Sequence, residues 1–388
     1  MNAAPRRICA VSGSRADYGL LLPVLRAIQR HPSLELQLAV TGSHLEHRFG
    51  NTVDAIRDDG FSVDARVPLG LEDDSVATIT RALGRCVSGF AAELARLRPD
   101  LLLVLGDRYE ILGAVQAALI ARIPVAHIAG GDVTEGAFDD AIRHAISKLA
   151  HLHFVTHDRA RRRVRQLGEA DGRVFVTGSP GIDQILETPL LERSELERRL
   201  GMALQTRNLA LTFHPATLEI DDALQQLEQL LDAIEKLDGT FGLVFTGANA
   251  DPRGQAINER LACFVAGHAH AVHHASLGQQ GYYSLLAIAD AVVGNSSSGL
   301  YEAPTLRTPT VNIGDRQSGR LKAASVIDCP PEAAAIGAAI ERALRLDCSD
   351  VVNPDGDGRA TERIMAVLAG PWDAQDRLRK GFTDRDCC

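Results

Sequence analysis

Three consecutive serines end an apolar run in the segment VVGNSSSGLYE, residues 292–302. The pattern predicts a strand that ends in a glycine turn and then opens a helix. Hydroxyls at Ser296 and Ser297, together with backbone N–H groups at the start of that helix, suit the binding of a diphosphate. A serine that only caps the helix is the alternative, but capping needs one serine and not three.

The same segment also bears on whether the chain has an ATP-binding loop and whether it binds a ribose. Its glycines have the spacing of a P-loop, but Leu300 and Tyr301 stand where that motif needs lysine and a hydroxyl residue, so an ATPase loop is excluded. Glu302 falls about one turn into the helix, where its carboxylate could accept hydrogen bonds from two vicinal hydroxyls, such as those of a ribose. A glutamate that only favours the helix dipole is the alternative.

An arginine stands in the first strand-to-helix turn, GSRADYG at residues 13–19. The turn lacks the GxGxxG spacing of a dinucleotide site, so a nicotinamide or flavin cofactor is not indicated. Arg15 at such a turn can fork onto a phosphate. An exposed Arg15 that pairs with Asp17 is the alternative.

Carboxylates follow two further apolar runs. LLLVLGDRYE ends a strand at Asp107 and adds Arg108, and PVAHIAGGDVTEGAFDDAIRH ends a strand at His127. The second segment then supplies Asp132, Glu135, Asp139 and Asp140. Carboxylates that gather in one place raise one another's pKa, which suits proton transfer.

Structural roles stay open for several of these residues. Asp139 and Asp140 also fit the acidic first turn of the helix AFDDAIRHAISKLA. His127 could be a core histidine, and His214 in LTFHP could be a strand-end side chain that hydrogen-bonds the backbone.

The elements that position these residues alternate between strand and helix. Stretches of helical periodicity, such as YGLLLPVLRAIQR and YEILGAVQAALIAR, separate short apolar runs at residues 8–13, 36–42, 101–107, 124–131, 152–157 and 174–179, and a second series of runs at 208–214, 242–249, 271–276, 291–297 and 309–314. This alternation predicts an α/β protein with two doubly wound, Rossmann-like parallel sheets covered on both faces. Ligands of such sheets bind at the carboxyl ends of the strands, where the polar residues lie.

Two domains are expected for a chain of 388 residues. Glycine and proline in GSPGID place the boundary there, which gives domains of 1–178 and 179–388. The helical stretch 359–368 is a candidate to pack back on the first domain.

Composition excludes several classes of function. No stretch approaches the ~20 apolar residues that span a bilayer. The N-terminal run ICAV is far shorter than the roughly 7 to 15 residues of a signal peptide core, so we expect a cytoplasmic protein without membrane contact. A net charge of −9 disfavours nucleic acid as a partner. The seven cysteines show no CxxC spacing, which predicts neither disulfides nor a metal site.

The motifs taken together resemble those of a known family. RADYG, LGDRYE, HIAGGDVTEGAFDDAIRHAISKL, LTFHP, GNSSSGLYEAP and PTVNIGDRQSGR are similar to the motifs of the hydrolysing UDP-N-acetylglucosamine 2-epimerases of sialic and legionaminic acid biosynthesis. The resemblance implies two Rossmann-like domains that face each other across a cleft, the glycosyltransferase-B architecture, with a nucleotide sugar as partner. It also implies a homo-oligomer, a dimer or a tetramer.

The resemblance assigns roles to residues of this chain. Its nucleotide-binding set comprises Arg15, Arg108, Asn249, Ser296, Ser297, Glu302 and Arg316. Its catalytic set comprises Asp107, Asp132, Asp139 and His214. One departure concerns the catalytic set, because many relatives have a glutamate where this chain has Ala129. Asp132 stands where another glutamate of the family follows the glycine pair. Asp132 could share the role of the carboxylate that is missing at position 129.

The implied reaction needs neither a metal nor a cofactor. A nucleoside diphosphate leaves C1 of the sugar while a carboxylate removes the C2 proton, which gives a glycal. Water then adds at C1 and C2 is reprotonated from the opposite face. The product is a free 2-epimeric sugar such as N-acetylmannosamine.

Other functions and two sugars stay open. The alternatives are a non-hydrolysing epimerase, a glycosyltransferase of the same architecture, and a binding protein with a decayed site. The sugar is N-acetylglucosamine or 2,4-diacetamido-2,4,6-trideoxyglucose, on UDP or GDP. Ala129 and Phe138 favour the bulkier diacetamido sugar, unless Ala129 faces the core and Phe138 is a helix staple.

Overall fold

The computed structural model describes residues 4–47, 50, 52–73, 75–134, 138–215, 222–247, 252–371, 373 and 378–385. The chain forms two compact units: unit 1 comprises Met1–Gln184 and Asp355–Cys388, and unit 2 comprises Ile185–Pro354. The expected ranges of 1–178 and 179–388 therefore need correction. The junction falls inside the helix α7 (Pro180–Glu187), and the chain returns to unit 1 after Pro354.

Unit 1 contains a seven-stranded parallel sheet in the order β3-β2-β1-β4-β5-β6-β7. Its strands are β1 (Arg6–Ser12), β2 (Leu34–Thr41), β3 (Ala65–Val67), β4 (Leu101–Leu105), β5 (Val125–Ile128), β6 (Leu152–Val155) and β7 (Val174–Val176). Its helices are α1 (Arg15–Arg30), α2 (Val53–Asp58), α3 (Val76–Leu97), α4 (Tyr109–Ile120), α5 (Phe138–Leu149), α6 (Asp158–Gln166) and α14 (Ala360–Leu368), with 3-10 turns η1 (Gly42–Leu45) and η3 (Asp171–Arg173).

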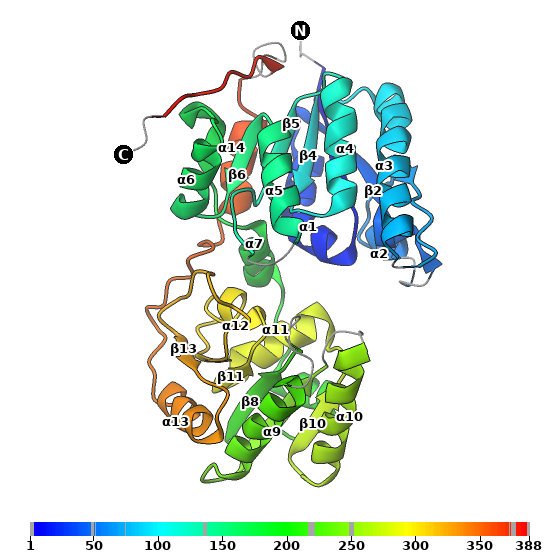
Figure 1. Cartoon of the computed structure of the whole chain (residues 1–388). Coiled ribbons are helices and arrows are strands. Elements are labelled where there is room, and N and C mark those ends of the chain that lie inside the picture. Colours follow the sequence, from blue (N-terminus) through cyan, green and yellow to red (C-terminus); the bar gives the residue numbers. More distant parts are fainter. Residues whose placement is uncertain are drawn as a thin grey trace. The chain divides into compact units, whose positions relative to one another are not determined.

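Both faces of this sheet are covered, as the continuous apolar runs predict. Along β1, Ile8 and Ala10 pack into the cluster that includes residues of α1 and α14, whereas Cys9 and Val11 pack into the cluster that includes residues of α3 and α4. Successive side chains of a strand point to opposite faces, so alternate residues enter different cores. Figure 1 shows α3, α4 and α5 side by side on one face of the sheet.

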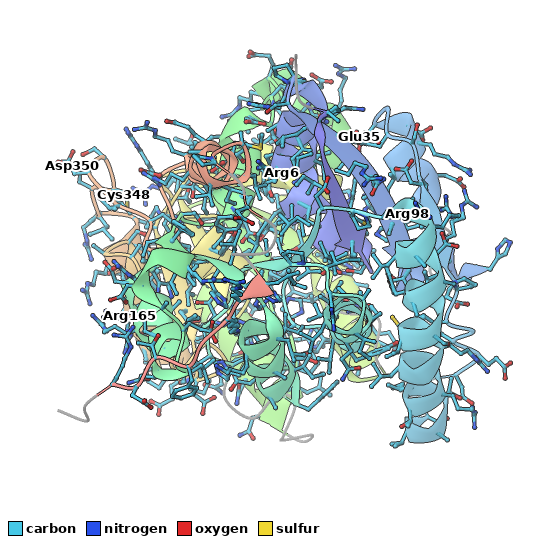
Figure 2. The ribbon with its side chains drawn as sticks, turned by 90° about the horizontal axis from the view of Figure 1, so that it is seen from above. Arg6, Glu35, Arg98, Arg165, Cys348 and Asp350 are labelled. Atoms are coloured by element: carbon cyan, nitrogen blue, oxygen red, sulfur yellow. The ribbon has the colours of Figure 1, made fainter. Side chains whose placement is uncertain are left out.

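The helix α14 completes unit 1 from the far end of the sequence (Figure 1). It packs on α1, and its residues Ile364 and Leu368 are fully buried. Figure 2 labels Arg6 beside this helix, and the guanidinium of Arg6 donates to the carbonyl oxygens of Leu368 and Gly370. The carboxylate of Asp183 accepts the first backbone N–H groups of α14, which fixes where the helix begins.

Unit 2 contains a six-stranded parallel sheet in the order β10-β9-β8-β11-β12-β13. Its strands are β8 (Arg207–Thr212), β9 (Phe241–Thr246), β10 (Ala271–His274), β11 (Ala291–Gly294), β12 (Thr310–Ile313) and β13 (Val326–Cys329). Its helices are α8 (Arg193–Leu200), α9 (Asp222–Glu235), α10 (Pro252–Ala266), α11 (Gly278–Ile288), α12 (Ser298–Tyr301) and α13 (Ala333–Ala343).

Each sheet reverses its strand order at one place. In unit 1 the reversal lies between β1 and β4, and in unit 2 it lies between β8 and β11. Helices leave such a pair of strands toward opposite faces, which opens a crevice at the carboxyl ends where ligands of doubly wound sheets bind. The predicted site residues follow these four strands or their neighbours in the sheet.

None of the helices in the described residues combines the length and the apolar character needed to cross a bilayer.

The core contact of α14 gives a test of the fold. Ile364 is fully buried against unit 1, so Ile364→Ala should lower the free energy of unfolding by roughly 2 to 5 kcal/mol, as for large-to-small core substitutions. Val76→Ala is the control, because Val76 is 83% exposed and its loss should change stability by less than about 0.5 kcal/mol. Urea unfolding followed by circular dichroism measures both. Equal effects of the two variants would contradict the packing described for α14.

Candidate functional site

The switch point of unit 1 carries three of the predicted residues. Arg15 opens α1 after β1 and is exposed, and Asp107 and Arg108 follow β4 directly. The strands β1 and β4 are neighbours, so these side chains share one edge of the sheet. The structure thus places Arg15 at the same edge of the sheet as Asp107 and Arg108, which follow it by more than ninety positions in the sequence.

The guanidinium of Arg143 organises the carboxylates around this edge. It pairs with Asp107, donates to Asp140 Oδ1 at 3.1 Å and donates to Thr134 Oγ1 at 3.0 Å. Its Nη1 also donates to the backbone oxygen of Asp132 at 2.9 Å. The Arg143 side chain is only 8% exposed, so its charge is balanced almost entirely by these acceptors. Arg143 therefore holds the end of β4, the loop after β5 and α5 in one arrangement.

Asp139 and Asp140 both lie in the first turn of α5, but their surroundings differ. Asp140 accepts the backbone N–H of Thr134 at 2.8 Å in addition to its bond with Arg143, which is a structural role. Burial raises the pKa of Asp139, and the charge of Asp107 raises it further, while Arg108 and Arg143 act in the opposite direction. Asp139 and Asp107 are thus electrostatically coupled, as two carboxylates of a proton-transfer site would be.

A buried glutamate supports Arg108. The Nε of Arg108 pairs with Glu110, whose side chain is fully buried in the first turn of α4. Asp17, in the first turn of α1, is also buried, and burial raises its pKa to about 6 although Arg108 lowers it. The direction of the Arg108 guanidinium is therefore set by the buried carboxylate of Glu110, and the structure, which describes both residues, shows no ion pair between Asp17 and Arg15.

His127 is a core histidine, which was the structural alternative. Its Nε2 lies 2.8 Å from the carbonyl oxygen of Gly106 and its Nδ1 lies 3.2 Å from Ser147 Oγ. Burial lowers its pKa to about 3, so the ring stays neutral near pH 7. This histidine braces β5 against β4 and takes no charge.

Ala129 occupies a strained turn after β5. Its φ is 63°, in the left-handed region, and its side chain packs against the buried cluster shared with Ile128 and Phe154. Ala129 therefore faces the core, the alternative that the sequence left open. Phe138 is 68% exposed, which does not fit a side chain packed as a helix staple.

In unit 2 the side chain of Asn295 joins the two switch-point strands. Its Oδ1 accepts the backbone N–H of His214 at 2.7 Å, and its Nδ2 donates to the backbone oxygen of His214 at 2.8 Å. The backbone oxygen of Asn295 accepts from Arg316 Nη1 at 3.0 Å and from Gln317 Nε2 at 2.9 Å. Asn295 thus brings His214 and Arg316, two predicted site residues, to the same edge of the sheet.

The serine cluster follows a glycine that the packing requires. Gly294 has a φ of 141°, and a Cβ there would lie 1.9 Å from the backbone oxygen of Thr212. Ser297 stands at the N-cap of α12 without a capping hydrogen bond from its side chain, so helix capping does not explain its hydroxyl. Ser298 instead turns inward, with its Oγ 2.5 Å from the hydroxyl of Tyr282.

Glu302 ends α12 with an enclosed carboxylate. Within the described part of the chain, its Oε2 is shielded from solvent and has no hydrogen-bond partner. Burial raises its pKa to about 7, and its charge contributes, after burial, to raising the pKa of Tyr282 to about 12. A buried acceptor without a partner is costly, so a donor from a ligand would stabilise it.

Two expectations concern residues or ions that this structure does not test. Asn249, predicted for the nucleotide pocket, lies outside the described residues. Over the described ranges, no group of three or more His, Cys, Asp and Glu side chains could hold a metal ion.

The sequence patterns did not predict the partners that hold Asp107 and Arg108. These partners, Arg143 and Glu110, lie on helices, where isolated charges usually indicate a solvated face. The spacing of Arg143 could have predicted one of its contacts. Arg143 stands three residues after Asp140, which allows an ion pair on one face of a helix.

The fold and the site define the class of this protein. Two doubly wound units, one with coupled carboxylates and one with hydroxyls and an arginine at its switch point, form the pair of Rossmann-like sheets of the glycosyltransferase-B type. The profile of the UDP-N-acetylglucosamine 2-epimerase family matches residues 26–369. The chain belongs to the UDP-N-acetylglucosamine 2-epimerase family.

Relatives and solved structures agree with this assignment. The chain is 40% identical to the GDP/UDP-N,N'-diacetylbacillosamine 2-epimerase (hydrolyzing) of Campylobacter jejuni, over 83% of this chain and 84% of the relative. It is 33% identical to the UDP-N,N'-diacetylbacillosamine 2-epimerase (hydrolyzing) of Legionella pneumophila, over 94% and 95%. It is 37% identical to the polysialic acid biosynthesis protein P7 of Escherichia coli, over 85% and 84%. The fold matches that of the Neisseria meningitidis UDP-GlcNAc 2-epimerase bound to UDP-GlcNAc, with a TM-score of 0.80 and 18% identity over 94% and 99% of the chains.

The raised pKa of Glu302 predicts a dependence of stability on pH. A pKa that rises from 4.5 to about 7 on folding means that the protonated form is favoured in the folded protein. Its contribution to stability is full below about pH 4.5 and is lost as pH rises through about 7. Glu302→Gln cannot ionise, so the midpoint of thermal unfolding of the wild type, measured relative to this variant without nucleotide, should fall across that window. If the difference in thermal midpoint between the two proteins stays constant from pH 4.5 to about 7, Glu302 is not enclosed.

Proposed function

We propose that this protein is a hydrolysing 2-epimerase of a nucleotide-linked N,N'-diacetylbacillosamine, the 2,4-diacetamido-2,4,6-trideoxy form of glucose. It releases the nucleoside diphosphate and the free 2-epimeric sugar. The observation that carries the proposal is the carboxylate of Asp107, which the buried guanidinium of Arg143 holds at the switch point of unit 1, together with the effect of its charge on Asp139. The names of the Campylobacter and Legionella relatives support both the hydrolysing reaction and the sugar.

The residues of unit 1 suit the chemistry at C1 and C2. Removing the C2 proton needs a carboxylate base, and returning a proton to the other face of C2 needs an acid. A carboxyl group whose pKa is raised by burial and by a neighbouring carboxylate, as for Asp139, keeps its proton to a higher pH than an ordinary aspartate, which suits the acid role. Arg108, directed by Glu110, offers a cation that stabilises the negative charge of the departing diphosphate.

The residues of unit 2 suit the nucleotide. Ser296, Ser297 and Arg316 supply hydroxyl and guanidinium donors for the diphosphate. Glu302 has an enclosed oxygen without a partner in the described chain, which fits a hydroxyl donor from the ribose. His214, at the end of β8 beside Asn295, completes the proposed catalytic set with Asp107, Asp132 and Asp139. Arg15 and Asn249 are proposed as further contacts of the nucleotide.

The names of the relatives support the diacetamido sugar, whereas Ala129 does not. Ala129 packs on the core, so it does not itself widen a sugar pocket. Phe138 is 68% exposed and offers an apolar surface at the start of α5, which suits the C6 methyl group of the diacetamido sugar better than a C6 hydroxyl. UDP and GDP are both open as the nucleotide.

Proton NMR of purified protein with each nucleotide sugar tests the function. We expect free 2-epimeric sugar plus nucleoside diphosphate, with a higher kcat/KM for UDP- or GDP-linked diacetylbacillosamine than for UDP-N-acetylglucosamine. An epimeric nucleotide sugar as product would identify a non-hydrolysing epimerase, and no turnover without an acceptor would favour a glycosyltransferase or a binding protein. A clear preference for UDP-N-acetylglucosamine would overturn the proposed sugar and leave N-acetylmannosamine as the product.

The two coupled carboxylates give a test of the site. Asp139→Asn should lower kcat by at least ~10²-fold, the lower range for a positioned acid or base, and we expect a loss of the same size in Asp107→Asn, because the charge of Asp107 helps to raise the pKa of Asp139. Asp158→Asn is the matched control, because Asp158 is exposed at the start of α6. The thermal midpoint of each variant separates lost chemistry from lost folding. A kcat within a few-fold of the wild type would remove that carboxylate from the mechanism.

Two further expectations belong to this proposal. A substrate that is a charged nucleotide sugar fits a cytoplasmic enzyme, and a homo-oligomer, dimer or tetramer, is expected from the resemblance to the family.

A further inference from the structure

The carboxylate of Asp132 is held by two donors that follow β6. Thr156 Oγ1 donates to Asp132 Oδ1 at 3.0 Å and Oδ2 at 3.3 Å, and His157 Nε2 lies 3.1 Å from Oδ1. Thr156 is buried and the His157 side chain is 14% exposed, whereas the side chain of Asp132 is 32% exposed. Two enclosed donors therefore fix a carboxylate that a ligand can still reach.

The tautomer of His157 is set by the helix that it caps. His157 is the N-cap residue of α6, and its Nδ1 accepts the backbone N–H of Ala160 at 3.0 Å. A ring nitrogen that accepts a hydrogen bond carries no proton, so the proton of the neutral ring lies on Nε2 and faces Asp132. The ring is therefore a donor to Asp132, and the carboxylate is the acceptor.

The backbone that carries Asp132 is fixed as well. Arg143 donates to the backbone oxygen of Asp132 at 2.9 Å, and Arg163 donates to that of Gly131 at 3.0 Å. Gly131 has a φ of 80°, and a Cβ there would lie 2.5 Å from the backbone oxygen of Ala160. The loop after β5 thus lies directly against α6, so the position of Asp132 is determined from both its main chain and its side chain.

We propose that Asp132 is the base that removes the C2 proton of the sugar, and that His157 and Thr156 are positioning residues that aim its carboxylate. The inference rests on the proposed function. The carboxylate of Asp132 is held by the donors Thr156 and His157, and its side chain stays 32% exposed, so it is both positioned and within reach of a substrate. In this step the C2–H electron pair becomes the C1–C2 double bond, the C1–O pair leaves with the nucleoside diphosphate, and the proton passes from Asp132 to solvent.

Asp139 is suited to the return transfer. Burial and the charge of Asp107 raise its pKa, so it carries a proton at a higher pH than an ordinary aspartate. Asp139 gives that proton to C2 while the oxygen of water bonds to C1, and the proton released by the water restores Asp139. One water is consumed, and both carboxylates end the cycle as they began it.

The double role of His157 allows its two functions to be separated. His157→Asn keeps a side-chain acceptor for the cap, because asparagine is a strong N-cap residue, but it is too short to reach Asp132. We expect an unchanged thermal midpoint and an unchanged affinity for UDP, with kcat lowered roughly 10- to 100-fold, the scale of a misplaced catalytic group. His157→Ala should lose the cap as well, and its thermal midpoint should fall.

A double-mutant cycle identifies the group through which His157 acts. Asp132→Asn alone should lower kcat by at least ~10²-fold. Adding His157→Asn to it should cause no further loss, because the group that His157 positions is already gone. A multiplicative loss in the double variant would show that His157 acts elsewhere, and an unchanged kcat in either single variant would overturn the proposal.

Two further measurements probe the C2 step and Thr156. With substrate deuterated at C2, the isotope effect on kcat should rise in His157→Asn, because proton removal becomes slower relative to product release. Thr156→Ser keeps the donor and should stay close to wild-type turnover, whereas Thr156→Val should lose about 10-fold. An isotope effect unchanged by His157→Asn would assign the lost activity to another step.

The experiment separates this inference from the proposed function. If the wild-type protein releases no free 2-epimer, the proposed function fails before any variant is compared. If the wild type is active and Asp132→Asn retains its kcat, only the assignment of the base fails.

Discussion

The buried guanidinium of Arg143 is the interaction on which the arrangement of unit 1 depends. Asp107, Asp139 and Asp140 would repel one another at the end of a sheet, and a single enclosed cation offsets that repulsion through direct bonds to Asp107 and Asp140. Because a guanidinium has its five donors in a fixed planar fork, it also sets the directions in which these acids point. The same guanidinium donates to the backbone oxygen of Asp132. Arg143 therefore fixes the geometry of the loop after β5 and also balances the negative charge of the site.

The parts of the fold that the sequence predicts are those in which every residue of a strand is buried. Runs such as LLLVL in β4 are covered on both faces and stand out as continuous apolar segments. The strands β3 and β13 went unpredicted because they are edge strands, three and four residues long, in which Arg66 and Asp328 are exposed. No local sequence pattern marks the return of the chain to unit 1 after Pro354. The return depends on the core that buries Ile364 and Leu368, and that core is formed by residues far away in the sequence.

Most predicted site residues follow the carboxyl ends of strands, which is where ligands of doubly wound sheets are expected, and their roles stay a prediction. The family inferred from these motifs is confirmed by the match to residues 26–369. What local sequence does not carry is the set of partners from other elements: Glu110 under Arg108, Asn295 across β8 and β11, and His157 against Asp132. These pairings depend on how helices dock on the sheet, and a charged or polar helix residue has the same pattern whether it faces water or another acid.

Unit 1 is discontinuous in sequence, and this has a consequence for how the protein is made. The ribosome releases residues 1–184 before the other segments, but the core on the α1 face of their sheet stays incomplete until α14, which supplies Ile364 and Leu368, has been synthesised. Unit 2, residues 185–354, is a single uninterrupted stretch and can form its own core before the chain ends. The order of completion is therefore the reverse of the order of translation: the later segment matures first, and the earlier one waits with the surface for α14 exposed. A nascent chain halted before residue 360 would present that apolar surface to chaperones.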